Sequence, residues 1–207
     1  RQKGGASYLS ALLGKGNDGG GGGGGAALSQ NEIQRVNALF PEEWGDEVPD
    51  GAFETFRGGV RPSLMGMVII PNRITKIGDR SFLKNFDITE IILPDTLTEI
   101  GNSAFDGCMG MTKINLPDTL REIGNNAFYG CYKLKEINLP DTLAVIGEYV
   151  FFGCYRLTEV SFPANLTAIG RHAFNRCPAL KQITFPSTLT DIGEYAFEAC
   201  YGLTEIT

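Results

Sequence analysis

The chain has 207 residues and a formal net charge of −6. This length suits one repeat domain with an N-terminal appendage, and the acidic balance argues against nucleic acid as a partner. No apolar run approaches the roughly 18 residues that a membrane-spanning helix needs, so no transmembrane segment is expected.

The first segment, residues 1–27, is of low complexity and contains an unbroken glycine run at 19–25. Such a run loses much backbone entropy on folding, which predicts a flexible Gly-rich tether. Residues 14–19 match the phosphate-loop pattern G-x-G-x-x-G, but that loop needs a strand before it and a helix after it. Because glycines follow instead, we expect no phosphate site here.

The next segment, residues 28–67, is expected to cap the repeat domain. Ser29 and Glu32 match a capping box, and apolar residues at helical spacing follow until a proline, which predicts a short N-terminal helix. An acidic loop then surrounds Trp44. Its carboxylates lack the spacing of a calcium-binding loop, so we expect a solvated loop. Residues 52–56 are a candidate capping strand.

Residues 68–207 form six copies of a 23-residue repeat without insertion or deletion. A fixed period of this kind predicts a solenoid in which each repeat is one coil. We number the coils one to six by their phenylalanines, which are Phe82, Phe105, Phe128, Phe151, Phe174 and Phe197.

Apolar residues also recur in columns. Ile91 and Leu93 lie two residues apart, which places both on one face of a strand. Each coil sends six or seven apolar side chains inward, and only stacked coils can bury them. Glu90 and Ile92 should then face outward. A glycine column, represented by Gly124, suits a turn with positive φ or a close backbone approach.

The repeat L-x-x-I-x-L-P-x-x-L-x-x-I-G-x-x-A-F-x-x-C, carried by residues 134–154 and their copies, resembles the BspA-like leucine-rich repeat family. The resemblance covers about residues 68–207. It implies a right-handed solenoid with a parallel β-sheet on one face, short helical or turn segments opposite, and a role in binding other proteins. Members of that family are often bacterial or protist surface proteins, and some are adhesins.

All five cysteines occupy one column of the repeat. They are Cys108, Cys131, Cys154, Cys177 and Cys200. Free cysteine is among the most buried residue types. The Cβ vectors of a column run parallel, and an odd count disfavours full pairing. We therefore expect a row of reduced, buried thiols.

Catalysis needs convergent titratable groups, and the chain has a single histidine, His172, at an outward position of coil five. No nucleophile–histidine arrangement can be built around it. One histidine with cysteines 23 residues apart matches no zinc spacing. We expect no enzymatic activity, no cofactor and no metal site.

Two surfaces remain as candidates for binding. The family resemblance favours the outer face of the sheet, whose candidate residues are Glu90, Lys113, Asn115, Glu136, Asn138 and Glu159. This face has no aromatic residue, although aromatic and arginine side chains usually anchor interfaces.

The second candidate surface lies on the opposite side, where aromatic residues fill positions outside the core pattern. Its residues are Tyr129, Tyr132, Tyr149, Phe152, Tyr155, Tyr195 and Tyr201. Exposed aromatic patches often mark contact sites. The alternative is that these rings only shield the turns beneath them.

The leading hypothesis is a non-catalytic protein–protein interaction scaffold with another protein as partner. The alternatives are a cell-surface adhesin or ligand-binding protein, and a structural subunit of a larger complex that could be membrane-associated. By family analogy the chain is at the cell surface or secreted, and an intracellular or organellar assembly is the other option. The sequence stops inside a strand, so either the chain is cut short or another chain covers this edge.

Overall fold

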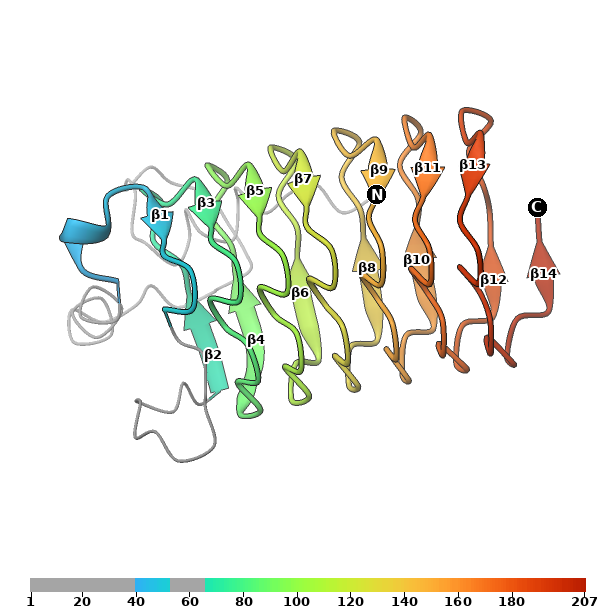
Figure 1. Ribbon diagram of the computed structural model, residues 1–207, viewed down its shortest axis with the longest axis horizontal. Coiled ribbons are helices and arrows are strands. Elements are labelled where there is room, and N and C mark those ends of the chain that lie inside the picture. Colours follow the sequence, from blue (N-terminus) through green and yellow to red (C-terminus); the bar gives the residue numbers. More distant parts are fainter. Residues whose placement is uncertain (1–39, 53–65) are drawn as a thin grey trace, which may run out of the picture.

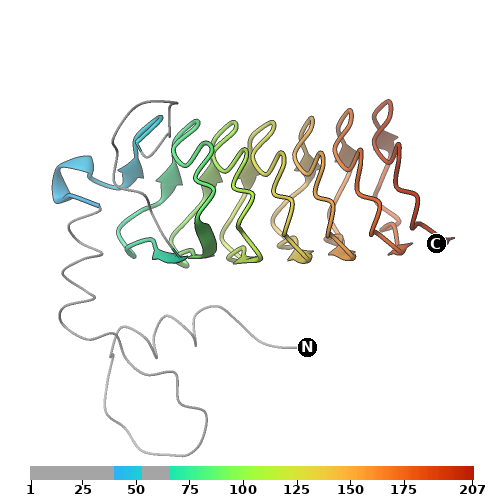
Figure 2. The same cartoon turned by 90° about the horizontal axis from the view of Figure 1, so that it is seen from below.

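The computed structural model describes residues 40–52 and 66–207, and in them the chain winds into a solenoid of parallel strands (Figure 1). The predicted tether at 1–27, the predicted helix and all but the first residue of the candidate strand at 52–56 lie outside the described residues. Each coil contributes strands to two separate rows, which lie on different sides of the coil (Figure 2).

The first row is the sheet that the apolar pattern predicts. It contains β2 (Gly66–Ile69), β4 (Ile88–Ile92), β6 (Lys113–Asn115), β8 (Glu136–Asn138), β10 (Glu159–Ser161), β12 (Gln182–Ile183) and β14 (Glu205–Ile206). The strands are hydrogen-bonded in three groups, β2–β4–β6, β8–β10 and β12–β14; all pairs are parallel, and from β4 onward paired residues are one repeat apart, as for Ile91 with Ile114. This register places equivalent residues of paired strands next to each other.

The second row consists of two-residue strands and was not predicted. Its members are β1 (Glu47–Val48), β3 (Lys76–Ile77), β5 (Glu99–Ile100), β7 (Glu122–Ile123), β9 (Val145–Ile146), β11 (Ala168–Ile169) and β13 (Asp191–Ile192). The rest of each coil is turns. Within the described residues the one helical segment is η1 (Glu42–Trp44), which precedes the repeats.

The acidic segment before the repeats docks on the solenoid. β1 pairs with β3, and Thr75 N donates to the carbonyl of Asp46 at 2.7 Å. Val48 is fully buried, and Lys76 forms an ion pair with Glu47 at 3.6 Å. The second half of the expected solvated loop is therefore the first rung of the second row.

A stack of phenylalanine rings runs through the core. Neighbouring rings from Phe82 to Phe197 lie 5.1–5.5 Å apart, centroid to centroid, with nearly parallel planes. The backbone between them is also linked: Phe128 N, for example, donates to the carbonyl of Val150 in the next coil at 2.9 Å. Ring stacking and hydrogen bonding therefore have the same repeat.

The structure decides the expectation for Gly124 and corrects the one for Ile92. A Cβ atom on Gly124 would lie 2.5 Å from Asn102 N, so close backbone approach, and not positive φ, requires glycine in this column. Ile92 was expected to face outward, but it is 8% exposed. It pairs in register with Ile69, which is equally buried, so the sheet face begins with an apolar pair.

Candidate protein-binding surface

The sheet face is polar and nearly flat. Lys113, Glu136 and Glu159 are exposed, whereas Glu90 is half-buried. Register sets Glu90 beside Lys113, and sets Glu136 beside Glu159, which is a like-charge pair. Asn115 and Asn138 are exposed next to them. These six candidates thus form one surface of mixed charge without an apolar anchor.

A shallow hollow lies on this face. It measures about 360 Å³ and is lined by Thr158, Glu159, Lys181, Gln182 and Thr204. All five are outward-facing polar residues of coils four to six. Small-molecule sites are mostly apolar and enclosed, so this depression is not one.

We call the side of the solenoid formed by the turns around the core phenylalanines the turn edge. This edge brings most of the predicted aromatic residues together. The Tyr129 and Phe152 rings stack at 4.7 Å with planes 3° apart, and the Tyr149 ring lies 5.8 Å from Phe152. Together with His172 and Tyr195, described next, these three residues form a group that we call the aromatic cluster. The stacking follows from the repeat, because equivalent positions in successive coils lie directly over each other.

His172 belongs to the aromatic cluster, which the sequence analysis did not recognise. Its ring stacks between Tyr149 at 4.7 Å and Tyr195 at 5.0 Å. Its Nδ1 lies 2.8 Å from Nδ2 of the buried Asn175, which also donates to Glu198 Oε2 at 2.6 Å. The shared column of Tyr149, His172 and Tyr195 was the signal that could have revealed it.

Tyr132 and Tyr155 form a second stack beside the first, with ring centroids 4.8 Å apart. Gly130 and Gly153 lie beneath, and a Cβ on Gly130 would approach the Tyr132 ring at 3.4 Å. Tyr201 is 86% exposed and has no ring contact among the described residues, since Pro178 occupies its column in coil five. It does not join the cluster.

Charged groups border the aromatic cluster. The Arg176 guanidinium lies 5.5 Å from the centre of the Phe152 ring, within cation–π range. Burial and, next, the carboxylate of Asp106 raise the pKa of Tyr129. Both charged residues occupy turn columns whose charge varies from coil to coil, so sequence periodicity alone did not single them out.

The backbone beneath the stack is left-handed. The φ angles of Tyr149, His172 and Tyr195 are 57°, 54° and 60°. This conformation costs a residue with a Cβ roughly 1–2 kcal/mol. Their backbone N–H groups offset part of this cost, because Tyr149 N and His172 N each donate to a carbonyl of the next coil at 3.0 Å.

The cysteine column is buried, as predicted. Each Sγ lies 3.1–3.4 Å from the phenylalanine carbonyl of the preceding coil, to which the thiol donates. Burial raises the pKa of Cys108 and of Cys154 to about 12. Because the thiolate is the nucleophile and the metal ligand, these groups are held in the unreactive form.

Residues 40–52 and 66–207 hold no group of three or more His, Cys, Asp or Glu side chains placed to bind a metal ion. They also include no helix long and apolar enough to span a membrane.

The fold and its surfaces define a leucine-rich-repeat solenoid, a class that typically serves as a binding scaffold. The pattern of the BspA type leucine rich repeat region matches residues 65–207 in six copies. The chain therefore belongs to the BspA-type leucine-rich repeat family, as the resemblance predicted.

Solved structures agree. The chain is similar to the leucine-rich repeat protein of T. pallidum, with 31% identity over 74% of this chain and 81% of that one, and a TM-score of 0.66. A leucine rich cell surface protein of Faecalibacterium prausnitzii shares 28% identity over 78% of this chain and 47% of its own, with a TM-score of 0.64. This chain thus spans less than half of that protein. No match was found among curated proteins.

Proposed function

We propose that this chain is a non-catalytic protein-interaction solenoid that binds its partner through the aromatic cluster and the adjoining Tyr132–Tyr155 stack. One observation carries the proposal: aromatic rings concentrate at turn positions of coils three to six, whereas at the same positions coils one and two have a single ring, Phe86, among polar and aliphatic residues. Coil two, for example, has Ser103 and Asp106 at the positions of Tyr149 and Phe152. The repeat itself does not require rings there.

Exposure supports a contact role beyond shielding. Stacking covers the faces of the inner rings, and Tyr129, Tyr149 and Phe152 are partly buried. Tyr155 and Tyr195 nevertheless remain 44% and 53% exposed. Rings that only covered the turns would gain most by being buried themselves. Tyrosine is also a residue type that anchors interfaces because it combines apolar area with a hydroxyl group.

A cell-surface or secreted location is the second part of the proposal. It is favoured by the similar F. prausnitzii protein, which is described as a leucine rich cell surface protein. An adhesin or ligand-binding protein would use the same solenoid. Protease treatment of intact cells tests this location: loss of the chain from unpermeabilised cells supports it, and full protection contradicts it.

The partner is best identified by crosslinking the native protein and mapping the crosslinks by mass spectrometry. Crosslinks at the turn edge support the proposal, and a fixed stoichiometry with several other chains would favour a structural subunit. The Tyr132→Ser/Tyr155→Ser variant should lose partner capture. A Glu136→Ala/Glu159→Ala variant is the matched control for the sheet face. Unchanged capture by the tyrosine variant, with only a lower melting temperature, would show that the rings shield the turns.

A further inference from the structure

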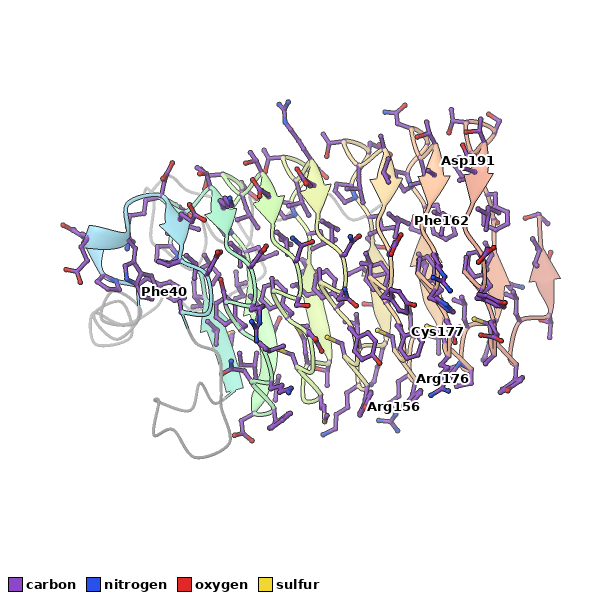
Figure 3. All side chains as sticks on the ribbon, in the orientation of Figure 1. Phe40, Arg156, Phe162, Arg176, Cys177 and Asp191 are labelled. Carbon is purple, nitrogen blue, oxygen red and sulfur yellow. The ribbon has the colours of Figure 1, made fainter. Side chains whose placement is uncertain are left out.

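Coils three to five of this acidic chain hold five basic side chains in three neighbouring columns of the repeat, from the turns to the start of the sheet face. We call them the basic strip: Lys133, Lys135, Arg156, Arg176 and Lys181. Figure 3 shows Arg156 and Arg176 on the same edge of the solenoid. Successive coils stack in register, so the strip runs along the solenoid axis across three coils.

The basic strip is exposed and has no carboxylate partner among the described residues. All five residues are exposed, and none forms an ion pair within the described part of the chain. By contrast, Lys76 bridges Glu47 and Glu99, and Arg171 lies 3.9 Å from Glu194. The acidic residues of the turn edge do not extend into the strip: Asp87 stands in coil one at the position of Lys133 and Arg156.

The borders of the strip limit what can bind it. On one side lie the exposed carboxylates of Glu136 and Glu159, directly after the strip in sequence and paired in register on the sheet face. A broad anionic surface, such as a membrane or a duplex, would meet these carboxylates as well. A narrow acidic chain could follow the cations and avoid them, so the charge pattern favours a peptide.

On the other side lies the Tyr132–Tyr155 stack, and Tyr155 is 44% exposed. Arg176 links the strip to the aromatic cluster through its contact with Phe152. Tyrosine and arginine are the residue types most often found as interface anchors. The strip therefore combines charge for steering with rings for affinity.

We propose that the basic strip, flanked by Tyr132 and Tyr155, binds an acidic peptide segment of a partner protein. This inference rests on the proposed protein-binding function and adds the chemistry of the partner. Glutamate or aspartate side chains would pair with the lysines and arginines, and apolar or aromatic residues between them would contact the tyrosine rings.

The test is direct binding of a short fluorescein-labelled peptide that alternates glutamate and tyrosine, followed by fluorescence anisotropy. A matched peptide with glutamine in place of glutamate is the ligand control. The acidic peptide should bind more tightly, and added salt should weaken it. The Lys133→Glu/Arg156→Glu variant should lose on the order of tenfold in affinity or more.

Lys113→Glu is the control variant, because it makes the same charge change on the sheet face, outside the strip. It should leave peptide affinity within about twofold of the unaltered chain. Both variants replace exposed side chains, so their melting temperatures should match that of the unaltered chain. Equal binding of the two peptides, or equal binding by the double variant, would overturn the proposal.

Three further arms decide between occupants. Binding of phosphatidylserine vesicles or heparin without binding of the acidic peptide would assign the strip to another anion and overturn the proposal. Self-association that the Lys133→Glu/Arg156→Glu variant abolishes would assign the strip to a second copy of this chain and would also overturn the proposal. If the peptide fails but Tyr132→Ser/Tyr155→Ser still abolishes capture of the native partner, only this inference fails and the protein-binding function stands.

Discussion

At their left-handed turns, coils one to three and coils four to six have the same backbone but different side chains. In the earlier coils, polar side chains link successive turns: Asp79 Oδ1 accepts from Asn102 N at 2.6 Å, and Asn102 Oδ1 accepts from Asn125 N at 2.9 Å. Asn125 Oδ1 then accepts from Glu148 N at 2.8 Å. We call this series the polar ladder.

In the later coils, stacked rings take over one column further on. Tyr149, His172 and Tyr195 replace Arg80, Ser103 and Asn126, and all six residues have φ between 53° and 60°. The left-handed turn is therefore common to all coils, whereas the side chains that stabilise it differ from coil to coil. Only the aromatic choice also creates a surface suited to binding.

The largest predicted effect tests whether the two halves share one core. Phe105 and Phe151 are both fully buried within the ring stack. Phe105→Ala and Phe151→Ala should each lower the free energy of unfolding by about 3–5 kcal/mol, because each leaves a cavity. Urea unfolding measures this, with Phe86→Ala, at a 49% exposed site, as a control near zero. Clearly unequal losses would mean that the halves are packed differently.

The second prediction breaks the polar ladder. Asn125→Ala removes the acceptor of Glu148 N and should cost about 1 kcal/mol. Asn125→Asp keeps the acceptor and should cost less. Asn115→Ala, on the sheet face, changes an exposed asparagine that supports no turn. If thermal melting gave Asn125→Ala and Asn115→Ala the same stability, the ladder would not support the turns.

Sequence reasoning predicted the solenoid, its core and the first row of strands, because apolar residues two positions apart repeat in every coil. It missed the second row, since strands of two residues such as Glu99–Ile100 are too short to show alternation. It also missed the left-handed turns. Glycine marks such a turn at Gly107, Gly130 and Gly153, but the left-handed column four residues earlier has Ser103 or Tyr149, whose side chains give no such signal.

The arrangement of the candidate site was also predicted only in part, because it depends on which residues share a column. Columns of tyrosine suggested a patch, and stacking follows from the register. His172 was considered only as a possible catalytic residue or zinc ligand, although its column places it between two tyrosines. Tyr201 was included because it shares the column of Tyr132 and Tyr155. Its column contains Pro178 in the preceding coil, which supplies no ring to stack on.

The third prediction breaks the aromatic stack at its exposed end. Tyr195→Ala removes the ring that lies 5.0 Å from His172 and should cost about 0.5–1.5 kcal/mol. Alanine retains the Cβ, so the strain of the left-handed backbone does not change. Tyr201→Ala, which removes an unstacked ring, should have almost no effect on thermal unfolding. Equal melting temperatures for both variants would argue against a structural role for the stack.

The smallest predicted effect concerns Asp106, which stands where the two chemistries meet. It occupies in coil two the position of Tyr129 in coil three and Phe152 in coil four. Burial raises the pKa of Asp106 above its ordinary value of 3.8, while Lys84 and Arg80 act in the opposite direction. The folded state therefore favours the protonated carboxyl more than the unfolded state does, and ionisation of Asp106 lowers the free energy of unfolding.

The sign of the pH dependence follows from this shift. The contribution of the protonated carboxyl is fully present below pH 3.8 and is lost as the pH rises through the higher pKa of the folded state. Asp106→Asn should thus raise stability at neutral pH by at most about 0.5 kcal/mol, because solvent screens this half-buried group. The gain should vanish below pH 3.8.

The same variant has a second readout at the aromatic edge. The Asp106 carboxylate helps to raise the pKa of Tyr129, so its removal should lower that pKa in an ultraviolet titration of the tyrosines. A stability gain without this change would place Asp106 out of electrostatic reach of the rings. A change in both would show that Asp106 contributes to the charge environment of the aromatic rings.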